Sequence, residues 1–363
     1  MDTLPKTQRA LVQKSYAERL VVEEVPVPQP SPGSVVLRVE ASAIISYQKQ
    51  ICNGTRKYPY STPMVPGTSA VGRVVAAGPD ATVLKPGQLV LFDMYIHARD
   101  DPGTVMFSGL YAGGDGGKIL MEGEWRDSSF AQFVKAPLEN CHVLNETRLC
   151  RELGYTVGQL TWIARAVVAY GGLRSIGLQA GETVIISPAT GGYGGSGAIV
   201  AAAMGARVIA LGRNLAALNS LAALSPRIHV VQMSDDHEAE MKALTAFRKA
   251  DAVLDLSPPM AKGWSHLTSC ILSLRHSGRV SLMGGVGEAE LPLFFIVRND
   301  ITLKGKLMYD YADVRDFIKL VETGVLSLNH VKIAGTFPLE QWEEAFDAAE
   351  KTRFDDVALL SAW

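Results

Sequence analysis

The chain has 363 residues, of which 47% are hydrophobic and 20% are charged, and its formal net charge at pH 7 is −2. This length exceeds what one small core needs and indicates two domains, or one large α/β unit with insertions. High apolar content with few charges excludes a largely disordered chain, and the near-zero net charge leaves no basic face for nucleic acid.

We expect neither a signal peptide at the N-terminus nor a membrane span in the chain. The first residues lack the apolar core of a signal peptide, and the longest nearly apolar stretch, 197–212, is shorter than a membrane span and contains Arg207. The four cysteines show no close paired spacing, which favours free thiols over a zinc site or a disulfide framework. We therefore expect a cytoplasmic protein that binds neither membrane nor nucleic acid.

The first 150 residues predict a series of short strands that end at prolines and glycines. The expected strands are 19–25, 35–41, 71–78 and 89–92. Residues 99–127 contain two glycine-rich or proline-containing turns and little periodicity. They predict a long loop or lid, and a loop of this length inside a compact domain is usually functional or mobile.

From residue 156 the pattern changes to helices that alternate with nearly apolar strands, which predicts a parallel sheet buried on both faces. The expected strands are 183–187, 207–211, 228–232, 251–256, 279–283 and 301–307. The expected helices are 156–170, 195–204, 215–224, 236–247 and 263–274. Two amphipathic helices, 312–323 and 339–351, and a final strand, 356–360, complete the chain.

The most informative motif joins the strand 183–187 to the helix that follows. Gly191 allows a tight turn there, Gly194 lets the backbone approach a pyrophosphate, and the helix N-terminus offers N–H groups to the phosphates. Ala189 replaces the first glycine of the G-x-G-x-x-G pattern, so a glycine-rich turn without a ligand is the alternative. We predict cofactor contacts from Thr190, Gly191, Gly192, Tyr193 and Gly194.

The end of the next strand favours NADP over NAD. An acidic residue at that place binds the ribose 2′-hydroxyl of NAD, but this chain has Gly212 followed by Arg213 and Asn214. Arg213 can pair with a 2′-phosphate, and a surface arginine without a ligand is the alternative. Two further strand ends point to the same crevice and supply the remaining predicted contacts, which are Ser257, Met283, Gly284 and Gly285.

Several segments together resemble the medium-chain dehydrogenase/reductase superfamily, most closely its zinc-independent alcohol-dehydrogenase-like and quinone or enoyl reductase branch. They are residues 65–75, 85–90, 178–184 and 204–208 and the glycine loop. The resemblance implies an α/β protein that forms a homodimer. It implies a Rossmann NADP-binding domain with a doubly wound parallel sheet, residues 155–307, inserted in a GroES-like, mostly-β catalytic domain, residues 1–154 and 308–363.

Two departures from the zinc-dependent relatives bear on the mechanism. Those relatives carry a cysteine near the position of Ile45, and a Gly-His-Glu where this chain has Gly67, Thr68 and Ser69. Neither replacement supplies a thiolate or imidazole ligand. A four-cysteine lobe for a structural zinc is also missing from residues 93–127. We therefore expect no zinc and a mechanism without a metal Lewis acid.

A conjugated C=C–C=O group needs less polarisation than a simple ketone, so we expect NADPH-dependent reduction of an activated C=C in an enone, enoyl or quinone substrate. Tyr47 is the candidate proton donor, with Ser46 and Lys49 as alternates. Two other functions stay open. One is a metal-free carbonyl reductase or alcohol dehydrogenase, and the other is a dinucleotide-bound protein without redox turnover or a redox-neutral enzyme.

The resemblance also suggests residues for the substrate pocket. Thr161 and Trp162 begin the helix that borders the cleft in relatives, and core packing is the alternative role. Tyr111 and Trp125 belong to the expected long loop and are candidates to cap a bulky apolar substrate, with exposure in the loop as the alternative.

Overall fold

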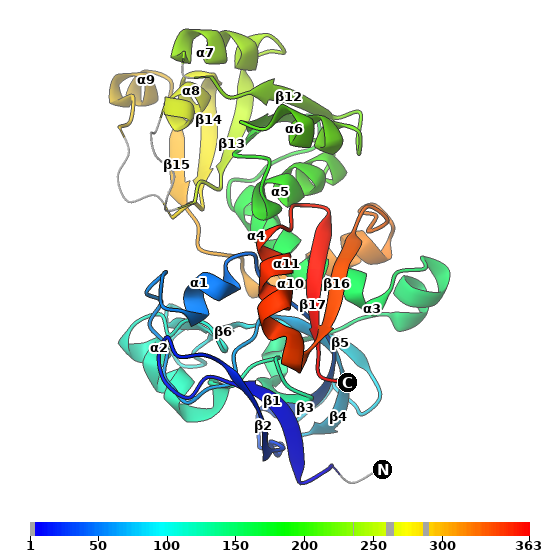
Figure 1. The fold of residues 1–363 in the computed structure, drawn as a ribbon. Helices are drawn as coiled ribbons and strands as arrows, with labels where there is room; N and C mark the ends of the chain where they lie inside the picture. The colour runs from blue at the N-terminus through cyan, green and yellow to red at the C-terminus, as the bar shows by residue number, and fades with distance from the viewer. Residues whose placement is uncertain (1–3, 235, 259–264, 286–289) are drawn as a thin grey trace. The chain divides into compact units, whose positions relative to one another are not determined.

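The computed structural model describes residues 4–234, 236–258, 265–285 and 290–363. The chain divides into two compact units (Figure 1). Unit 1 consists of residues 1–164, 331–352 and 356–363, and unit 2 consists of residues 165–330 and 353–355. A unit that interrupts the sequence of another is the organisation that we predict.

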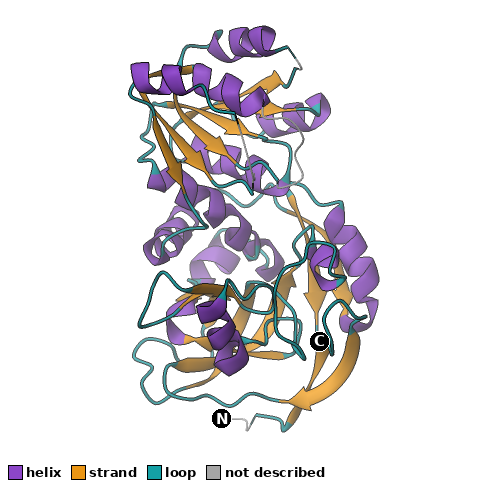
Figure 2. Cartoon of the chain, turned by 90° about the vertical axis from the view of Figure 1, so that its left-hand side faces the viewer, coloured by secondary structure: helices purple, strands orange, loops and turns teal. Residues whose placement is uncertain are grey.

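The described part of unit 2 contains a six-stranded parallel sheet of order β12-β11-β10-β13-β14-β15, with helices on both of its sides (Figure 2). The order changes direction between β10 and β13, which is the switch point of a doubly wound sheet. The predicted Rossmann sheet is thus confirmed. Its strands are β10 (Thr183–Ser187), β11 (Arg207–Gly212), β12 (Ile228–Gln232), β13 (Ala250–Asp255), β14 (Leu274–Leu282) and β15 (Thr302–Gly305).

Apolar side chains on the central strands hold this sheet against its helices. Ile185, Ile209, Val253 and Val280 are all 0% exposed, and each contributes about 1.5–3 kcal/mol by its burial. The helices are α4 (Trp162–Ser175), α5 (Gly192–Ala203), α6 (Leu215–Ala222), α7 (His237–Thr245), α8 (Ser265–Leu272), α9 (Leu293–Arg298) and α10 (Tyr311–Glu322). The predicted helix 263–274 starts at two residues that lie outside the described ones.

Unit 1 is mostly β, as predicted, and its main sheet has the order β16-β17-β3-β4-β5-β9, with β8 paired to β3. Two hairpins, β1–β2 and β6–β7, accompany it. The strands are β1 (Thr7–Val12), β2 (Val21–Pro26), β3 (Ser34–Ala43), β4 (Ala70–Ala77), β5 (Leu89–Phe92), β6 (Tyr95–His97), β7 (Val105–Phe107), β8 (Phe133–Pro137), β9 (Cys141–Val143), β16 (Lys332–Pro338) and β17 (Asp356–Ser361).

Short helices surround the sheet of unit 1. They are α1 (Gln48–Cys52), α2 (Asp115–Leu120), α3 (Val157–Leu160) and α11 (Trp342–Glu350), with π-helical segments Met121–Trp125 and Thr147–Glu152 and 3₁₀ turns Leu138–Asn140 and Leu339–Gln341. The Phe346 ring of α11 lies 6.0 Å from the Phe130 ring. Three ion pairs join the α11 region to N-terminal segments: Arg9–Glu340, Arg19–Glu343 and Lys49–Asp347.

The boundaries of the units differ from the predicted domain limits of 154/155 and 307/308. They fall at 164/165, inside α4, and at 330/331. Helix α10 belongs to unit 2 because it packs on α4, with the Phe317 ring 5.3 Å from the Tyr170 ring. Residues 353–355 also join unit 2, where the Phe354 side chain lies against Gly195.

Residues 99–127 are not the single irregular loop that the sequence predicts, because they contain β7, α2 and a π-helical segment. Gly117 explains the discrepancy. Glycine normally disfavours a helix, but a Cβ at Gly117 would lie 1.6 Å from the carbonyl oxygen of Ala112. The glycine is needed for close packing of α2 on the preceding turn, so glycine content alone was a misleading signal.

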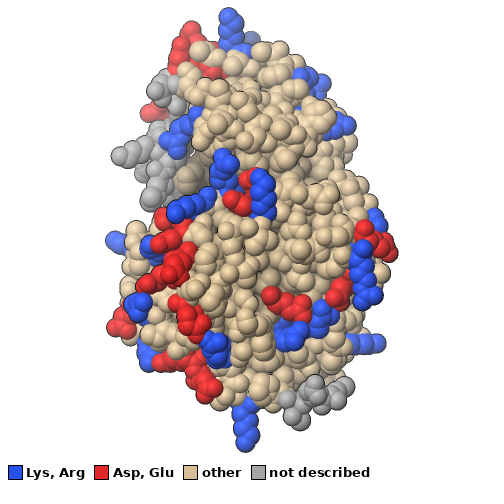
Figure 3. Space-filling view, turned by 45° about the vertical axis from the view of Figure 1, so that its right-hand side comes forward, with Lys and Arg blue, Asp and Glu red and all other residues tan. Residues whose placement is uncertain are grey.

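The face of the molecule in Figure 3 carries mixed charges. On the face shown in Figure 3, lysine and arginine side chains alternate with aspartate and glutamate, and neither sign dominates. Within the described ranges, none of the helices has the length and apolar character that a bilayer crossing demands.

Candidate active site: a nucleotide cradle and a hydroxyl cluster

A glycine-rich turn joins β10 to α5 in unit 2. Gly191 is the N-cap of α5, and no described side chain caps this helix. The N-terminus of α5 therefore presents the positive end of the helix dipole to an anion. Gly191 is exposed, and a Cβ there would meet nothing within 4 Å. The turn is thus open on the side where a phosphate would approach.

Gly191 and Gly194 are predicted to allow a tight turn and a close approach to a pyrophosphate. Their surroundings show what the absence of a side chain does at each position. Gly191 has a φ of −87° and open surroundings, so its backbone does not require glycine. Gly194 is buried, and a Cβ there would lie 1.8 Å from the carbonyl oxygen of Pro188. At Gly195 the Cβ would lie 2.4 Å from that of Phe354. Gly194 and Gly195 therefore let α5 pack closely, while Gly191 and the half-buried Tyr193 lie toward solvent.

The carboxyl end of β11 lies beside the turn. A Cβ on Gly212 would lie 2.7 Å from Cγ2 of Thr190, so a larger side chain there requires Thr190 to move. The Asn214 side chain accepts a hydrogen bond of 3.0 Å from the Ala217 N–H and caps α6. Arg213, between them, is exposed. Asn214 therefore has a structural role, and Arg213 is the cation that this strand end presents.

The ends of β13 and β14 form one continuous edge. The Met283 N–H donates to the Asp255 carbonyl at 3.0 Å, and the Gly285 N–H donates to the Ser257 carbonyl at 3.1 Å. A Cβ at Gly284 would lie 2.6 Å from the Asp255 carboxylate. The structure therefore brings together Ser257, Met283, Gly284 and Gly285, as the sequence predicts for strand ends of one sheet.

Sequence reasoning missed two polar residues at this edge, Asp255 and His266. The Ser257 hydroxyl donates to Oδ1 of Asp255 at 2.6 Å, and its oxygen lies 3.1 Å from Nε2 of His266 on α8. Asp255 and Ser257 are each 2% exposed. The Asp-x-Ser pattern at a strand end was the available signal, but His266 is distant in sequence and carries no motif.

Burial dominates the titration of this cluster. It raises the pKa of the Asp255 carboxyl, against hydrogen bonds from Ser257 that act in the opposite direction. It lowers the pKa of His266, and the positive charge of Arg213 acts in the same direction. The carboxylates of Asp255 and Glu240 oppose that lowering. His266 is therefore mainly neutral at pH 7.

The predicted proton donors lie around α1 of unit 1. Tyr47 is half-buried at the N-cap of α1, and the guanidinium carbon of Arg56 lies 3.9 Å from the centroid of its ring. Ser46 precedes it in the same turn and is also half-buried. Lys49 is exposed and lies 2.5 Å from Asp347, which raises the pKa of Lys49. Because Lys49 is held at the surface by an ion pair, Tyr47 is the stronger candidate.

The four predicted substrate residues fall into two groups. Trp162 is 0% exposed, and Thr161 is 1% exposed with its hydroxyl donating to the Gly158 carbonyl at 2.7 Å. These placements favour core packing. Tyr111 and Trp125 are half-buried against the core of unit 1, and the Tyr111 ring lies 5.2 Å from that of Tyr58. Neither side chain is on a fully exposed loop.

Hydroxyl groups occupy positions 68 and 69, where zinc-dependent relatives carry ligands. The Thr68 hydroxyl donates to the Ala43 carbonyl, and the Ser129 hydroxyl donates to the Thr68 carbonyl at 2.6 Å. The Ser69 hydroxyl accepts from the Met94 N–H at 3.1 Å. Among the residues that the structure describes, no three His, Cys, Asp or Glu side chains are grouped to hold a metal. This donor set does not fit a zinc ion.

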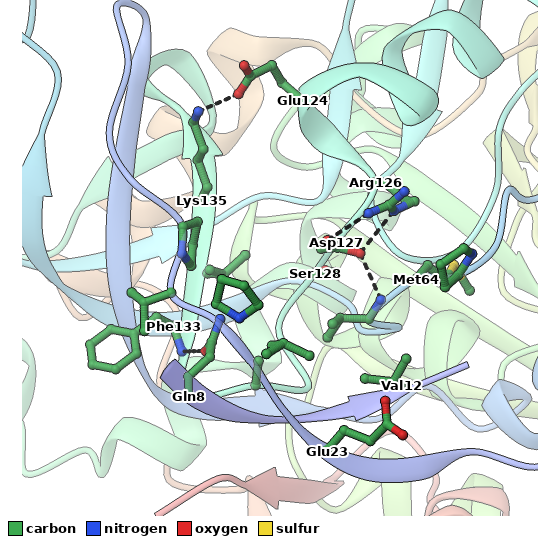
Figure 4. Close-up of a pocket in the computed structure, with 18 residues that line it drawn as sticks. Gln8, Val12, Glu23, Met64, Glu124, Arg126, Asp127, Ser128, Phe133 and Lys135 are labelled. Carbon is green, nitrogen blue, oxygen red and sulfur yellow. Dashed lines mark hydrogen bonds and ion pairs between the residues drawn. The ribbon is translucent and has the colours of Figure 1, made fainter. Parts of the chain in front are cut away.

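A separate cavity of about 510 Å³ lies in unit 1 between the β1–β2 hairpin and the segment 124–135 (Figure 4). Ion pairs Glu124–Lys135 and Arg126–Asp127 lie at its edge, and Val12, Met64 and Phe133 are among its apolar lining. The predicted donors and substrate residues are not part of this lining. The cavity is therefore distinct from the predicted site.

Comparisons with known proteins follow the division into units. Residues 31–146 match the model "Alcohol dehydrogenase GroES-like domain", and residues 192–323 match the model "Zinc-binding dehydrogenase". An alcohol dehydrogenase of Rhizobium meliloti is 27% identical over 98% of both chains. An acryloyl-coenzyme A reductase of Metallosphaera sedula is 26% identical over 93% of this chain and 95% of its own. The crystal structure of AibC matches with a TM-score of 0.80 at 21% identity, over 98% of this chain and 96% of its own.

Proposed function

The chain is an oxidoreductase that belongs to the medium-chain dehydrogenase/reductase superfamily, and we propose that it reduces activated C=C bonds with NADPH and without zinc. The proposed substrates are small or medium apolar enones, enoyl compounds or quinones. The observation that carries the proposal is the hydroxyl cluster around Thr68 and Ser69, whose groups are engaged in hydrogen bonds within unit 1. The acryloyl-coenzyme A reductase among the relatives is consistent with this chemistry.

The donor set at Thr68 and Ser69, in the part of the chain that the structure describes, does not suit zinc, and this supports a restriction on the substrate. A zinc enzyme uses its ion to polarise a carbonyl or an alkoxide, and a simple ketone needs that help more than a conjugated one. When bound, the reduced nicotinamide supplies a hydride to the β-carbon of the substrate. The negative charge then resides on the enolate oxygen, and the Tyr47 hydroxyl supplies the proton to that oxygen or to the α-carbon.

The preference for NADPH rests on Gly212 and Arg213. An acidic side chain at position 212 is absent and would displace Thr190, and Arg213 offers a guanidinium for the 2′-phosphate. Arg213→Ala should weaken NADPH binding by about 1.5–3 kcal/mol and leave NADH binding nearly unchanged, as measured by fluorescence titration. Arg227→Ala is the matched control, since Arg227 is also exposed in unit 2 and its guanidinium donates to the Gly205 carbonyl at 3.3 Å. Equal losses for NADPH and NADH would remove Arg213 from this role.

Two measurements test the reaction. NADPH absorbance should fall with enones or quinones and fall more slowly with simple aldehydes and ketones, and elemental analysis should find far less than one zinc per chain. Stoichiometric zinc would refute the metal-free mechanism. Faster turnover of simple carbonyls would favour the carbonyl reductase. A flat absorbance with every substrate, despite NADPH binding, would favour a protein without redox turnover.

The proposed homodimer has a candidate interface in unit 2. Helix α9 exposes Leu293, Phe294 and Val297 at 66%, 79% and 76%, and β15 is the end strand of the sheet. An apolar patch beside an open sheet edge suits pairing with a second copy. Phe294→Glu should convert a dimer into a monomer in sedimentation analysis, while Ile119→Glu, at an exposed apolar residue of unit 1, should not. A wild-type monomer would refute the dimer.

A further inference from the structure

The hydrogen-bonded chain Asp255–Ser257–His266 is not used by the proposed reaction. We propose that His266 is a second, protonation-dependent contact for the 2′-phosphate of NADP(H), acting together with Arg213. The inference rests on the proposed cofactor preference and adds a pH dependence to it. Three features of unit 2 support the inference. They are the place of the hydrogen-bonded residues at the sheet edge, the tautomer of the His266 imidazole, and the charged groups around that ring.

The position is that of a ligand site in an open parallel sheet. Asp255 is the last residue of β13, and it pairs in register with Ser187, the last residue of β10. These two strands flank the switch point, and ligands of doubly wound sheets bind outside the carboxyl ends of the strands there. The glycine-rich turn that cradles the phosphates starts at the next residue, Pro188. The chain Asp255–Ser257–His266 therefore lies at the level of that turn.

The tautomer of the His266 imidazole follows from counting protons. The Ser257 hydroxyl has one hydrogen, and it donates that hydrogen to Asp255 at 2.6 Å. At the 3.1 Å contact with His266, the serine oxygen can therefore only accept. Nε2 of His266 carries the proton in the neutral ring, and Nδ1 is the nitrogen that gains one on protonation. Protonation converts Nδ1 from an acceptor into a charged donor, as an anion requires.

The charges around His266 connect this protonation to the cofactor. Burial lowers the pKa of His266 most, and the positive charge of Arg213, in the β11–α6 connection, lowers it further. Asp255 from β13 and Glu240 from α7 are the negative groups that act on the ring, and Glu240 is only 2% exposed. A phosphate dianion beside Arg213 and His266 offsets the repulsion by Arg213. It raises the pKa of His266, so binding takes up a proton.

The sign of the pH dependence follows. With the 2′-phosphate bound, the pKa of His266 is higher than in the protein alone, so NADPH affinity falls as the pH rises through the pKa of the complex. The limiting effect is about tenfold in affinity for each unit by which the phosphate raises that pKa. NADH lacks the phosphate, and its affinity should stay constant. The range from pH 6.5 to 8.5 is suitable because a phosphate monoester has a second pKa of about 6.

The experiment is a fluorescence titration of the full chain with NADPH and NADH across that pH range. We expect the Kd of NADPH to rise severalfold with pH and the Kd of NADH to stay flat. In His266→Gln the Kd of NADPH should be flat and close to the wild-type value at high pH. His229→Gln is the matched control, since His229 on β12 also has a lowered pKa but packs on Phe247, and it should keep the wild-type slope.

The outcomes separate this inference from the cofactor preference. If NADPH binds no more tightly than NADH at any pH, the cofactor preference is wrong. If NADPH is preferred but its Kd does not change with pH, or if the slope persists in His266→Gln, the role of His266 is wrong. Calorimetry of the wild-type chain in two buffers of different ionisation enthalpy gives a second measurement, which does not depend on a variant that folds. Proton uptake should accompany NADP⁺ and not NAD⁺, and equal uptake would overturn the proposal.

Discussion

The glycine-rich turn of unit 2 and the hydroxyl cluster of unit 1 are built in different ways. The turn offers backbone N–H groups, and the glycines that shape it do so by lacking a side chain, as the contact between Gly194 and the Pro188 carbonyl shows. The cluster consists of side chains, and the Thr68 and Ser69 hydroxyls bond to the Ala43 carbonyl and the Met94 N–H.

This difference affects how each kind of site responds to substitution. A site made of backbone groups tolerates many side-chain substitutions as long as a few glycines remain. A metal site depends on the chemical identity of each ligand, so two replacements are enough to remove it. We therefore expect dinucleotide binding to be the property that this chain shares with its relatives, and the chemistry at the acceptor to be its own.

The largest expected effect is on chemistry without an effect on binding. Tyr47→Phe removes the proposed proton donor and keeps the ring beneath Arg56. Loss of a general acid lowers kcat by about 10²–10⁴. The Kd of NADPH should not change, because Tyr47 belongs to unit 1 and the predicted cofactor contacts belong to unit 2. Stopped-flow or steady-state rates measure this, with Lys49→Met as the control that should retain activity. A normal kcat for Tyr47→Phe would exclude Tyr47 as the donor.

A smaller effect is expected when the backbone site is changed. Gly194→Ala places a methyl group 1.8 Å from the Pro188 oxygen, which should cost about 1–3 kcal/mol of stability and weaken NADPH binding. Gly191→Ala is the matched substitution, since its methyl group meets nothing within 4 Å, and its stability should be near that of the wild type. Denaturant unfolding compares the two. Equal stability losses would show that the turn does not have the packing described.

The smallest effect concerns the hydroxyl cluster itself. Thr68→Val keeps the shape of the side chain but removes the donor to the Ala43 carbonyl, and the loss of one such bond costs about 1 kcal/mol. Thr68→Ser keeps the hydroxyl and should restore most of that stability. Neither variant should change zinc content or NADPH affinity. A large loss of turnover in Thr68→Val alone, with stability retained, would instead give this hydroxyl a part in the reaction.

Much of the fold could be predicted from the sequence, because buried parallel strands are nearly all apolar and end at glycines or prolines. β5, β10 and β12 have the predicted bounds to the residue. The segment 99–127 could not be predicted, because the glycines that indicate a loop there are needed for contacts such as that of Gly117 with Ala112. The boundary between the units within α4 could not be predicted either, since it depends on the packing of Phe317 against Tyr170.

The candidate site was partly predictable for a similar reason. The residues at strand ends, such as Gly212 and Gly284, follow from the topology of the sheet, and the structure brings them beside Thr190 and Asp255. The full burial of Trp162 could not be inferred, since helical periodicity does not show how many neighbours surround a residue. The contact between Ser257 and His266 links a strand end to a separate helix, and such contacts have no local pattern.

The strand order of unit 1 has a consequence for synthesis on the ribosome. β16 and β17 pair with each other and β17 also pairs with β3. Ion pairs join α11 to Arg19 and Lys49, and the 3₁₀ turn before it to Arg9. The main sheet of unit 1 is therefore complete only after residues 332–361 have been translated. Unit 2, although translated later, contains nearly all of its chain before residue 331. We expect the nucleotide unit to fold before β3, which already pairs with β4 and β8, gains its third partner β17.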